Sequence, residues 1–427
     1  MEGYVMKEKT SEWFGRLPAS WSIIPLKYAF SIKKNIAGET GHTVLSVTQK
    51  GIKPKKMNEK GQFALDYSKY QLVNPGDFVM NHMDLLTGWV DISQYDGVTS
   101  PDYRVFFNTN PNLFSSEYYK YIFQLCYTNR IFYGMGQGVA GFGRWRLPSD
   151  MFLNFLLPVP GIDEQRAISS YLDAQCTLID AAIAEAKASI EEYKTWKASV
   201  IFQAVTRGID TNVEFRMSEI DWIDEIPVHW KVCRIKDCAT FAPTCNINHL
   251  SKDSIVTFAP MECIKNGFYI PREAVFGDIA SSYTMFQEGD IVFAKVTPCF
   301  ENGNIAIMEG LSNSFGYGSS ELFVLRPNKV ERRYLFYFLQ NEKFKQLGCS
   351  TMTGTGGLKR VSGNFVKNCY LPLPPIKEQI NIADFLDNIC NMIQSIVIDK
   401  QDLVRKLEAY KHSLIFEVVT GKRKVVL

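Results

Sequence analysis

The clearest pattern along the chain is a seven-residue spacing of uncharged, mostly apolar side chains, and it occurs twice. Each occurrence consists of two parallel seams, and three of the twenty seam positions are lysine. The first pair of seams is Leu172, Ile179, Ala186, Tyr193 and Val200 with Cys176, Ile183, Ile190, Lys197 and Ala204. The second pair, 214 positions later, is Leu386, Ile393, Lys400, Leu407 and Leu414 with Cys390, Val397, Val404, Lys411 and Val418. This spacing predicts two long helices of the coiled-coil type, the first over residues 163–205.

Prolines precede both helices. They are Pro158 and Pro160 in the first copy, and Pro372, Pro374 and Pro375 in the second. Proline is excluded from a helix interior, so each helix is predicted to begin just after its prolines. Glu164 and Glu378 then fall in the first turn, where a negative charge suits the helix dipole.

Each helix could pack on its own globular part, or the two could pair with each other. A helix of about 43 residues would be roughly 65 Å long and would overhang a compact domain of 150 residues. Two similar helices in one chain also offer each other a partner, so we favour an intramolecular pair. The residues expected at this interface are Leu172, Ile179, Ile183, Ile190, Leu386, Ile393, Val397, Val404 and Leu407.

The rest of the chain is duplicated as well. Motifs recur at offsets of 209 to 214 residues and in the same order. The matches are WFGRLPASWSIIPLK (13–27) with WIDEIPVHWKVCRIK (222–236), NPGDFVM (74–80) with QEGDIVF (287–293), LPVPGIDEQ (157–165) with LPLPPIKEQ (371–379), and SVIFQAVTRG (199–208) with SLIFEVVTGK (413–422). The chain is therefore two copies of one unit of about 210 residues, each a globular part followed by a proline-rich segment and a long helix.

The two globular parts, residues 14–156 and 223–370, are predicted to be α+β. Short runs of β-branched and aromatic residues alternate with turn signals in both. Strands are expected at 42–47, 103–107, 254–258 and 321–325, and one helix in each part, at Ser116–Asn129 and Glu331–Leu347. The helical segments with their proline-rich starts are then 157–208 and 371–421.

Composition restricts the class of protein. The chain of 427 residues is 46% hydrophobic and 22% charged, as in a globular protein, and no apolar run reaches the length of a membrane span. The N-terminus does not resemble a secretory signal, and none of the ten cysteines forms a C-x-x-C pair, so a cytoplasmic protein with reduced thiols is expected. The net charge of +2 is too small for binding of a polyanion by the total field, so such binding would need local patches.

Catalytic and cofactor-binding motifs are missing from the sequence. It contains neither a phosphate-binding P-loop nor a G-x-S-x-G nucleophile elbow, and it lacks the Asp-Pro-Pro-Tyr type of signature found in adenine methyltransferases. Cys233, Cys238, Cys245 and Cys263 have spacings that fit no common zinc site. We therefore predict no catalytic residue, no metal and no cofactor on this chain.

Several basic and aromatic residues are suited to binding DNA. Glycine-rich stretches precede arginines at matched places in the two copies, which suits contact with a phosphate backbone or a guanine edge. The candidates are Lys50, Lys53, Lys55 and Lys56 in one basic loop, Arg144, Arg146, Lys359 and Arg360 after the glycines, and the aromatic residues Tyr103 and Tyr317. A solvated lysine cluster and core aromatics are the alternative interpretations for the loop and the tyrosines.

The duplicated layout resembles one family, the specificity subunits of type I restriction–modification systems. The matching residues are Pro18 and Trp21 with Pro227 and Trp230, Glu164-Gln165 with Glu378-Gln379, and Gly76-Asp77 with Gly289-Asp290. No single motif is strong, but their repeated order covers nearly the whole chain.

The resemblance implies both an architecture and a function. Each globular part would be a target-recognition domain with a curved mixed sheet, and the two long helices would form an antiparallel coiled coil between them. Each domain would read one half of a split DNA sequence. Two methyltransferase subunits and two restriction subunits would dock on the chain, and these partners would use S-adenosylmethionine, ATP and Mg²⁺. Two other classes stay open, a self-contained nuclease or methylase and a structural adaptor that does not contact DNA.

Overall fold

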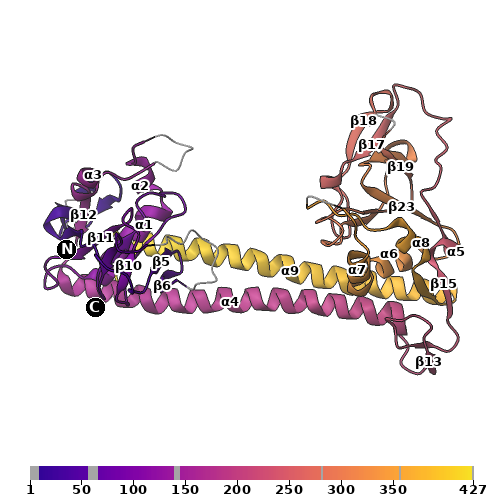
Figure 1. Ribbon diagram of the computed structural model, residues 1–427, viewed down its shortest axis with the longest axis horizontal. Coiled ribbons are helices and arrows are strands. Elements are labelled where there is room, and N and C mark those ends of the chain that lie inside the picture. The colour runs from indigo at the N-terminus through magenta and orange to yellow at the C-terminus, as the bar shows by residue number, and fades with distance from the viewer. Residues whose placement is uncertain (1–8, 56–65, 139–144, 280–281, 355–356, 426–427) are drawn as a thin grey trace, which may run out of the picture. The chain divides into compact units, whose positions relative to one another are not determined.

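The computed structural model describes residues 9–55, 66–138, 145–279, 282–354 and 357–425 (Figure 1). The chain divides into two compact units. Unit 1 consists of Met1–Ala186 with Leu403–Leu427, and unit 2 of Lys187–Asp402. Each unit therefore combines one globular part, the beginning of the long helix that follows it, and the end of the long helix that follows the other globular part.

The elements of unit 1 are mostly short strands. The strands are β1 (Lys9–Ser11), β2 (Gly15–Leu17), β3 (Ser22–Pro25), β4 (Phe30–Lys33), β5 (Leu45–Thr48), β6 (Gly51–Pro54), β7 (Gln71–Val73), β8 (Phe78–Met80), β9 (Val90–Ile92), β10 (Gly97–Thr99), β11 (Arg104–Asn108) and β12 (Leu156–Val159). The helices are η1 (Leu26–Tyr28), α1 (Ser116–Thr128), α2 (Ile131–Gly134), α3 (Ser149–Leu153) and the start of α4 (Ile162–Arg207).

Unit 2 repeats this order. Its strands are β13 (Phe215–Met217), β14 (Glu225–Pro227), β15 (Lys231–Arg234), β16 (Ala239–Phe241), β17 (Ile255–Ala259), β18 (Arg272–Val275), β19 (Thr284–Gln287), β20 (Ile291–Ala294), β21 (Ile305–Ile307), β22 (Phe315–Gly318), β23 (Leu322–Pro327) and β24 (Tyr370–Leu373). Its helices are α5 (Ile235–Cys238), η2 (Met261–Cys263), η3 (Phe276–Asp278), η4 (Ser312–Ser314), α6 (Arg332–Gln340), α7 (Glu342–Ser350), α8 (Gly363–Asn368) and the start of α9 (Ile376–Val419).

A four-stranded antiparallel sheet lies at the centre of each globular part. Its order is β4-β11-β8-β9 in unit 1 and β16-β23-β20-β21 in unit 2. Unit 2 adds a second sheet, β18-β17-β22-β19, in which β17 and β22 run parallel. The described residues of unit 1 form the two-stranded pairs β5-β6 and β10-β7 at the corresponding place, joined by a parallel bridge between Val44 and Val98. The α+β fold class predicted from the sequence is confirmed, with all four predicted strands displaced by one to three residues.

Aromatic side chains fill the core between the central sheet and α1 in unit 1. Phe30, Phe78 and Phe106 from three adjacent strands surround Phe123 of α1, with ring centroids 5.3 to 5.5 Å from it. All four rings are fully buried, and such edge-to-face pairs add to the stabilisation from buried apolar area. In unit 2, the central strands contribute Phe293 and Phe323 together with the aliphatic Ile291 and Leu325.

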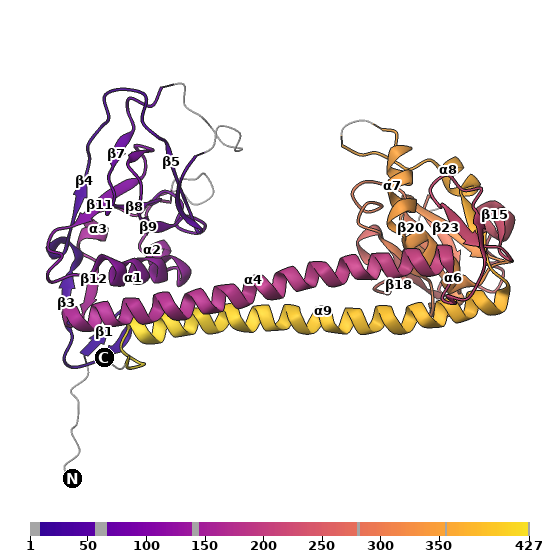
Figure 2. The ribbon, with the colours of Figure 1, turned by 90° about the horizontal axis from the view of Figure 1, so that it is seen from below.

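The helix pair forms part of the core of unit 1. Leu172, Ile179 and Ile183 of α4 are buried in one cluster with Val404 and Leu414 of α9. The two segments run in opposite directions, as the ribbon from below shows (Figure 2). The seam lysine Lys411 is accommodated at the edge, where its ammonium lies 2.6 Å from the carboxylate of Asp180.

Unit 2 contains the same antiparallel pairing made from the other ends of the helices (Figure 2). Ile190 of α4 is buried against Ile393 and Val397 of α9. The seam lysine Lys400 places its ammonium 5.8 Å from the ring centre of Tyr193, a cation–π contact. In both units, a lysine at a seam position therefore keeps its stem on the seam and its charge at the edge.

Two of the five prolines before the helices lie in short strands, and Pro160, Pro374 and Pro375 lie between the strand and the helix. Pro158 is part of β12, which pairs with β3, and Pro372 is part of β24, which pairs with β15. Both strands are members of two-stranded sheets, where a missing N–H is tolerated at an open edge. The long helices begin after them, at Ile162 and Ile376, as the sequence predicted.

The single helix predicted over Glu331–Leu347 is wrong, because Asn341 interrupts it. Asn341 has extended backbone angles and is buried. Its side-chain oxygen accepts a hydrogen bond from the Phe344 N–H at 2.9 Å, and its side-chain nitrogen donates to the Phe338 carbonyl at 2.6 Å. One residue thus ends α6 and N-caps α7, a role in which asparagine outcompetes continuation of the helix.

None of the helices in the described part of the chain has a stretch apolar and long enough to cross a bilayer.

Candidate nucleic-acid interface

A tryptophan shared by both copies fastens each globular part to the start of its long helix. In unit 1, the Trp21 indole nitrogen donates to the Glu164 carboxylate at 3.1 Å. In unit 2, the Trp230 indole nitrogen donates to Glu378 at 2.9 Å. Both indoles are buried, and both acids lie in the first turn of their helix. The repeated tryptophan and glutamate therefore build a structural joint, which explains their spacing in the sequence.

The glutamine that follows each glutamate completes this joint. Gln165 is fully buried, and its side-chain oxygen accepts a hydrogen bond from the Ser115 N–H at 2.8 Å. Gln379 accepts in the same way from the Glu331 N–H at 2.7 Å. Each amide nitrogen also donates to the carbonyl of the proline five residues earlier, at 2.9 and 2.7 Å. The Glu-Gln motif thus fixes the N-terminus of α1 or α6 to the start of a long helix.

A buried tyrosine then links each globular part to the end of the other long helix. The Tyr118 hydroxyl donates to the Val419 carbonyl at 2.9 Å, and the Tyr334 hydroxyl to the Val205 carbonyl at 3.1 Å. Burial raises the pKa of both phenols well above its usual value, so both hydroxyls keep the proton they donate. Sequence reasoning missed these residues, although the tyrosine-rich segments 116–121 and 331–338 contain them.

The Gly-Asp motif orients the strand that follows it. Gly76 has a φ of +90°, which favours glycine, and the carboxylate of Asp77 accepts from the N–H three residues earlier at 2.8 Å. Asp77 is buried and pairs with Lys33 at 2.6 Å. In unit 2, the fully buried Asp290 is held by both Nε and Nη2 of Arg326, at 2.7 and 2.8 Å.

Both matched arginines lie at the base of a glycine-rich loop that is closed in the same way. Gln137 and Arg146 exchange two backbone hydrogen bonds of 2.8 and 2.9 Å. Thr353 and Arg360 exchange two of 3.1 and 2.8 Å. Gly354, at φ +142°, lies so close to the Leu358 carbonyl that a Cβ there would approach it to 2.3 Å. The structure therefore brings the two arginines to equivalent positions. The described residues that contain them, 145–147 in unit 1 and 359–361 in unit 2, are called the arginine straps.

The same backbone bond anchors both straps to the central sheet. The N–H of Leu147, directly after Arg146, donates to the His82 carbonyl at 3.2 Å. The N–H of Val361, directly after Arg360, donates to the Lys295 carbonyl at 2.8 Å. Both acceptors follow the strand that begins at the Gly-Asp motif, so this motif and the arginine strap form one structural assembly.

The charge around the two arginines differs. Arg146 is exposed and makes no ion pair with any residue that the structure describes. Arg360 is held by Glu321, whose oxygens lie 2.9 Å from Nε and 2.7 Å from Nη2. The hydrogen bond from Arg360 is the main reason why the pKa of Glu321 is lowered, so this carboxylate is ionised at neutral pH.

A second arginine is buried beneath the unit 1 strap. Arg104 is 4% exposed, donates to the Leu147 carbonyl at 2.8 Å and stacks on the ring of Phe152 at 4.5 Å. Its Nη1 has no hydrogen-bond partner, and burial lowers its pKa to about 10. Burial, together with the charges of Arg104 and Arg146, also lowers the pKa of His82 to about 4. His82 is therefore neutral at pH 7, and Arg104 is a cation that sequence reasoning did not single out.

The other basic candidates lie on the surface or outside the described residues. Lys53 is exposed within β6, and Lys50 is exposed directly before this strand. Lys55, directly after β6, is half-buried, and Lys359 is exposed next to Arg360. Lys56 and Arg144 are not among the described residues. Lys50 and Lys53 lie in one short hairpin with β5, so the predicted basic loop is in part a strand.

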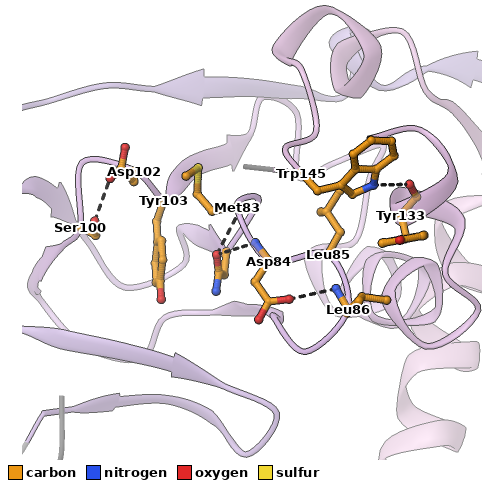
Figure 3. A pocket seen from close by; sticks show the side chains of 10 residues that line it. Met83, Asp84, Leu85, Leu86, Ser100, Asp102, Tyr103, Tyr133 and Trp145 are labelled. Atoms are coloured by element: carbon orange, nitrogen blue, oxygen red, sulfur yellow. Dashed lines mark hydrogen bonds between the residues drawn. The ribbon is translucent and has the colours of Figure 1, made fainter. Parts of the chain in front are cut away.

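Tyr103 lines a pocket of about 510 Å³ in unit 1 (Figure 3). Ser100, Asp102 and Tyr103 lie on one side of this pocket, and Trp145 lies with Tyr133 on the other. The Trp145 indole nitrogen donates to the Tyr133 carbonyl at 2.9 Å, which leaves the indole ring to line the pocket. Burial raises the pKa of the Tyr103 phenol, so it is protonated and able to donate a hydrogen bond.

Tyr317, the second aromatic candidate, lies in β22 of the additional sheet in unit 2. Its side chain is buried, with its ring centroid 5.0 Å from Phe315 and 5.9 Å from Phe276. The ring belongs to a small apolar cluster with Val256.

The seam residues proposed as an interface lie where the helices meet in each unit. Eight are buried, and Leu407 is half-buried. In unit 1, these are Leu172, Ile179, Ile183, Val404 and Leu407, and in unit 2 they are Ile190, Leu386, Ile393 and Val397.

Comparison with known proteins connects this arrangement to a family. Residues 227–403 match the family model described as Type I restriction modification DNA specificity domain. The chain is 34% identical over 173 residues to the Escherichia coli type I restriction enzyme EcoEI specificity subunit, covering 39% of this chain and 29% of that protein. It is 32% identical over 202 residues to the Escherichia coli type I restriction enzyme EcoAI specificity subunit, covering 46% and 33%. The matched regions thus span about a third of the length of these two relatives.

Two solved structures share the fold. A chain from a study of complex assembly and conformational transition in the type I R-M system aligns with a TM-score of 0.71 at 14% identity, covering 95% of this chain and 99% of that one. The HsdS subunit from Thermoanaerobacter tengcongensis aligns with a TM-score of 0.54 at 15% identity, covering 97% and 100%. The family match covers the second copy, and the first copy repeats the joint that the second contains. The second copy therefore contains a segment that matches the type I restriction modification DNA specificity domain, and the chain is similar to specificity subunits of type I restriction enzymes.

Proposed function

We propose that this chain is the non-catalytic DNA-specificity subunit of a type I restriction–modification complex. Each globular part reads one half of a bipartite, asymmetric target in duplex DNA, and the long helices set the unread gap between the halves. The observation that carries the proposal is that the same arginine strap occurs in both globular parts, at Arg146 and at Arg360. The side chains that surround the two arginines differ.

The chemistry of these straps fits DNA. A guanidinium group presents a planar fork of donors that matches phosphate oxygens or the O6 and N7 atoms of guanine. Because the side chains around the two arginines differ, the two globular parts would read two different short sequences. Each correctly read base pair contributes about 1–3 kcal/mol, so two half-sites in one complex give high selectivity.

The catalytic steps belong to partner subunits in this proposal. Two methyltransferase subunits dock on the chain and modify adenine with S-adenosylmethionine, and two restriction subunits use ATP and Mg²⁺ in the cytoplasm. Exposed apolar side chains on the long helices are the surface that we assign to a protein partner, since exposed apolar patches mark interaction sites. They are Leu178, Leu403 and Tyr410 in unit 1, and Trp196, Ile376, Ile380, Phe385, Met392 and Ile398 in unit 2.

The first test is an exchange of residues 14–156 for the matching part of another family member. We expect one half of the target to change and the other half to stay the same. Sequencing of modified adenines across the genome of the producing cells reads out both halves. A change in both halves would contradict independent reading. Adding S-adenosylmethionine or Mg²⁺ to the purified chain with DNA tests the alternative of a self-contained methylase or nuclease, for which turnover is expected.

The second test lengthens the helices. Seven residues inserted after Ala186 and after Lys400 keep both seams and add about 10 Å. This length corresponds to roughly three base pairs of B-DNA at about 3.4 Å each, so the preferred gap should grow by about two to four pairs because DNA twist also changes. Insertion into only one helix breaks the pairing and is the control. A preference for the original gap would mean that the helices do not set it.

A further inference from the structure

The residue equivalent to Glu321 in the first copy is Asp102, and the backbone identifies the match. The Asp102 N–H donates to the Ser100 hydroxyl at 3.2 Å, and the Glu321 N–H donates to the Ser319 hydroxyl at 3.2 Å. The next N–H in each copy donates to the carbonyl of the same serine, at 3.0 and 3.2 Å. Both acids therefore occupy one place in the fold, at the start of the strand beside the arginine strap.

The two acids behave differently at this place. Both oxygens of Glu321 are engaged by the fork of Arg360, and one lies 4.0 Å from the Lys295 ammonium. Lys295 is itself held by the Ser320 carbonyl at 2.7 Å. Asp102, one methylene shorter, forms no ion pair with Arg146 or with any other described residue. Among the described residues, the guanidinium of Arg146 therefore has no acidic partner, whereas that of Arg360 is neutralised by Glu321.

A carboxylate fork and a DNA phosphate engage the same donors. Bidentate carboxylate and phosphate contacts use two N–H groups of one guanidinium edge, and guanine uses its O6 and N7 atoms in the same way. Glu321 already occupies the Nε and Nη2 edge of Arg360. Since the pair lies at the surface, with side-chain exposures of 27% and 49%, exchange with another anion is possible without unfolding.

We propose that Glu321 competes with DNA for Arg360, so that the second globular part binds non-target duplex weakly and engages when its half-site supplies further contacts. The first globular part, with Arg146 unpaired, would supply most of the salt-dependent attraction to any sequence. This inference rests on the proposed DNA-reading function and adds a specificity-determining residue to it. Glu321 thus increases specificity by weakening binding to non-target DNA, without strengthening binding to the target.

The test is Glu321→Gln in the full chain, assembled with its methyltransferase subunit, on a duplex that lacks the target. The variant releases Arg360, so affinity should rise by about two- to fivefold, in the range of a broken surface ion pair. The slope of log affinity against log salt should steepen by about 0.9, because one more phosphate contact releases one more counterion. Equilibrium titration at four or five salt concentrations measures both quantities.

Two controls separate this mechanism from a general gain of positive charge. Asp102→Asn makes the same change of charge at the equivalent place and should alter the slope by less than half as much. Adding Glu321→Gln to Arg360→Ala should give no gain over Arg360→Ala alone. An unchanged slope in Glu321→Gln, an equal effect of Asp102→Asn, or a gain that persists without Arg360 would each overturn the inference.

A further comparison does not depend on the folding of the Glu321 variant. Arg146→Ala should reduce the salt slope by about one on every sequence, whereas Arg360→Ala should reduce it by clearly less on non-target DNA. Equal reductions would contradict a neutralised Arg360. Absence of salt-dependent binding by the unaltered complex would instead contradict the proposed function itself.

Discussion

Unit 1 and unit 2 share the hydrogen bonds that connect each globular part to the long helices, but their globular parts differ. The Trp–Glu bond, the buried glutamine and the tyrosine that reaches a helix end recur within a few tenths of an ångström. The central strands of both units place buried phenylalanines in the core, but unit 2 has an additional four-stranded sheet. This difference shows that the repeated motifs preserve the contacts between each globular part and the long helices. The sequence between the motifs can vary and so change the surface of the globular part.

The buried acid of the Gly-Asp motif offers the largest contrast between the units. Arg326→Met leaves the fully buried Asp290 without its bidentate partner, and breaking a buried pair in this way costs about 3–5 kcal/mol. Each acid keeps one backbone hydrogen bond, from Asn74 to Asp77 and from Gln287 to Asp290. Lys33→Met should cost less, about 1–2 kcal/mol, because Asp77 keeps some solvent contact. Urea unfolding of both variants measures the free energy. A larger loss for Lys33→Met would contradict the comparison.

The buried glutamines Gln165 and Gln379 offer a second comparison of the two units, with a smaller expected loss of stability. Gln165→Leu removes hydrogen bonds to Ser115, Leu113 and the proline carbonyl, whereas Gln379→Leu removes those to Glu331 and one proline. Each buried group left without a partner costs about 1–3 kcal/mol, so about 2–4 kcal/mol is expected, with the greater loss in unit 1. Thermal unfolding with Gln165→Glu and Gln379→Glu as size-matched variants checks the order.

The smallest expected effect distinguishes the units by pH. His82 has its pKa lowered from 6.5 to about 4, so the unfolded chain binds a proton between these values that the folded chain does not. Stability from this source is full above pH 6.5 and is lost as the pH falls toward 4, by on the order of 2 kcal/mol. The equivalent place in unit 2 is occupied by Lys295 and not by a histidine.

The measurement is the free energy of unfolding between pH 7 and 4.5 for the unaltered chain and for His82→Gln. The substitution should flatten the curve without moving its value at pH 7 by a comparable amount. An unaltered slope in His82→Gln would show that this imidazole does not contribute.

Most of the architecture could be predicted from the periodicity of the sequence. The helices, the duplication and the central strands follow from spacing, because heptads and repeated motifs are local in sequence. The break at Asn341 and the registers of the short strands depend on tertiary contacts that spacing does not encode. The arginine positions followed from the offset of 214, but the pairing of Arg360 with Glu321 did not, because nothing local indicates which acid lies opposite a loop. Buried Arg104 was missed because it stands alone on a strand with no acidic partner.

The tyrosine that reaches a helix end has a consequence for synthesis on the ribosome. Residues 187–402 contain everything that unit 2 uses, and its link from Tyr334 to Val205 spans 129 residues. The link from Tyr118 to Val419 in unit 1 spans 301. A chain that emerges from its N-terminus can therefore complete unit 2 first, while the earlier-made globular part waits for the final helical turns. A purified chain that ends at residue 402 should therefore contain a protease-resistant unit 2 and a protease-sensitive unit 1.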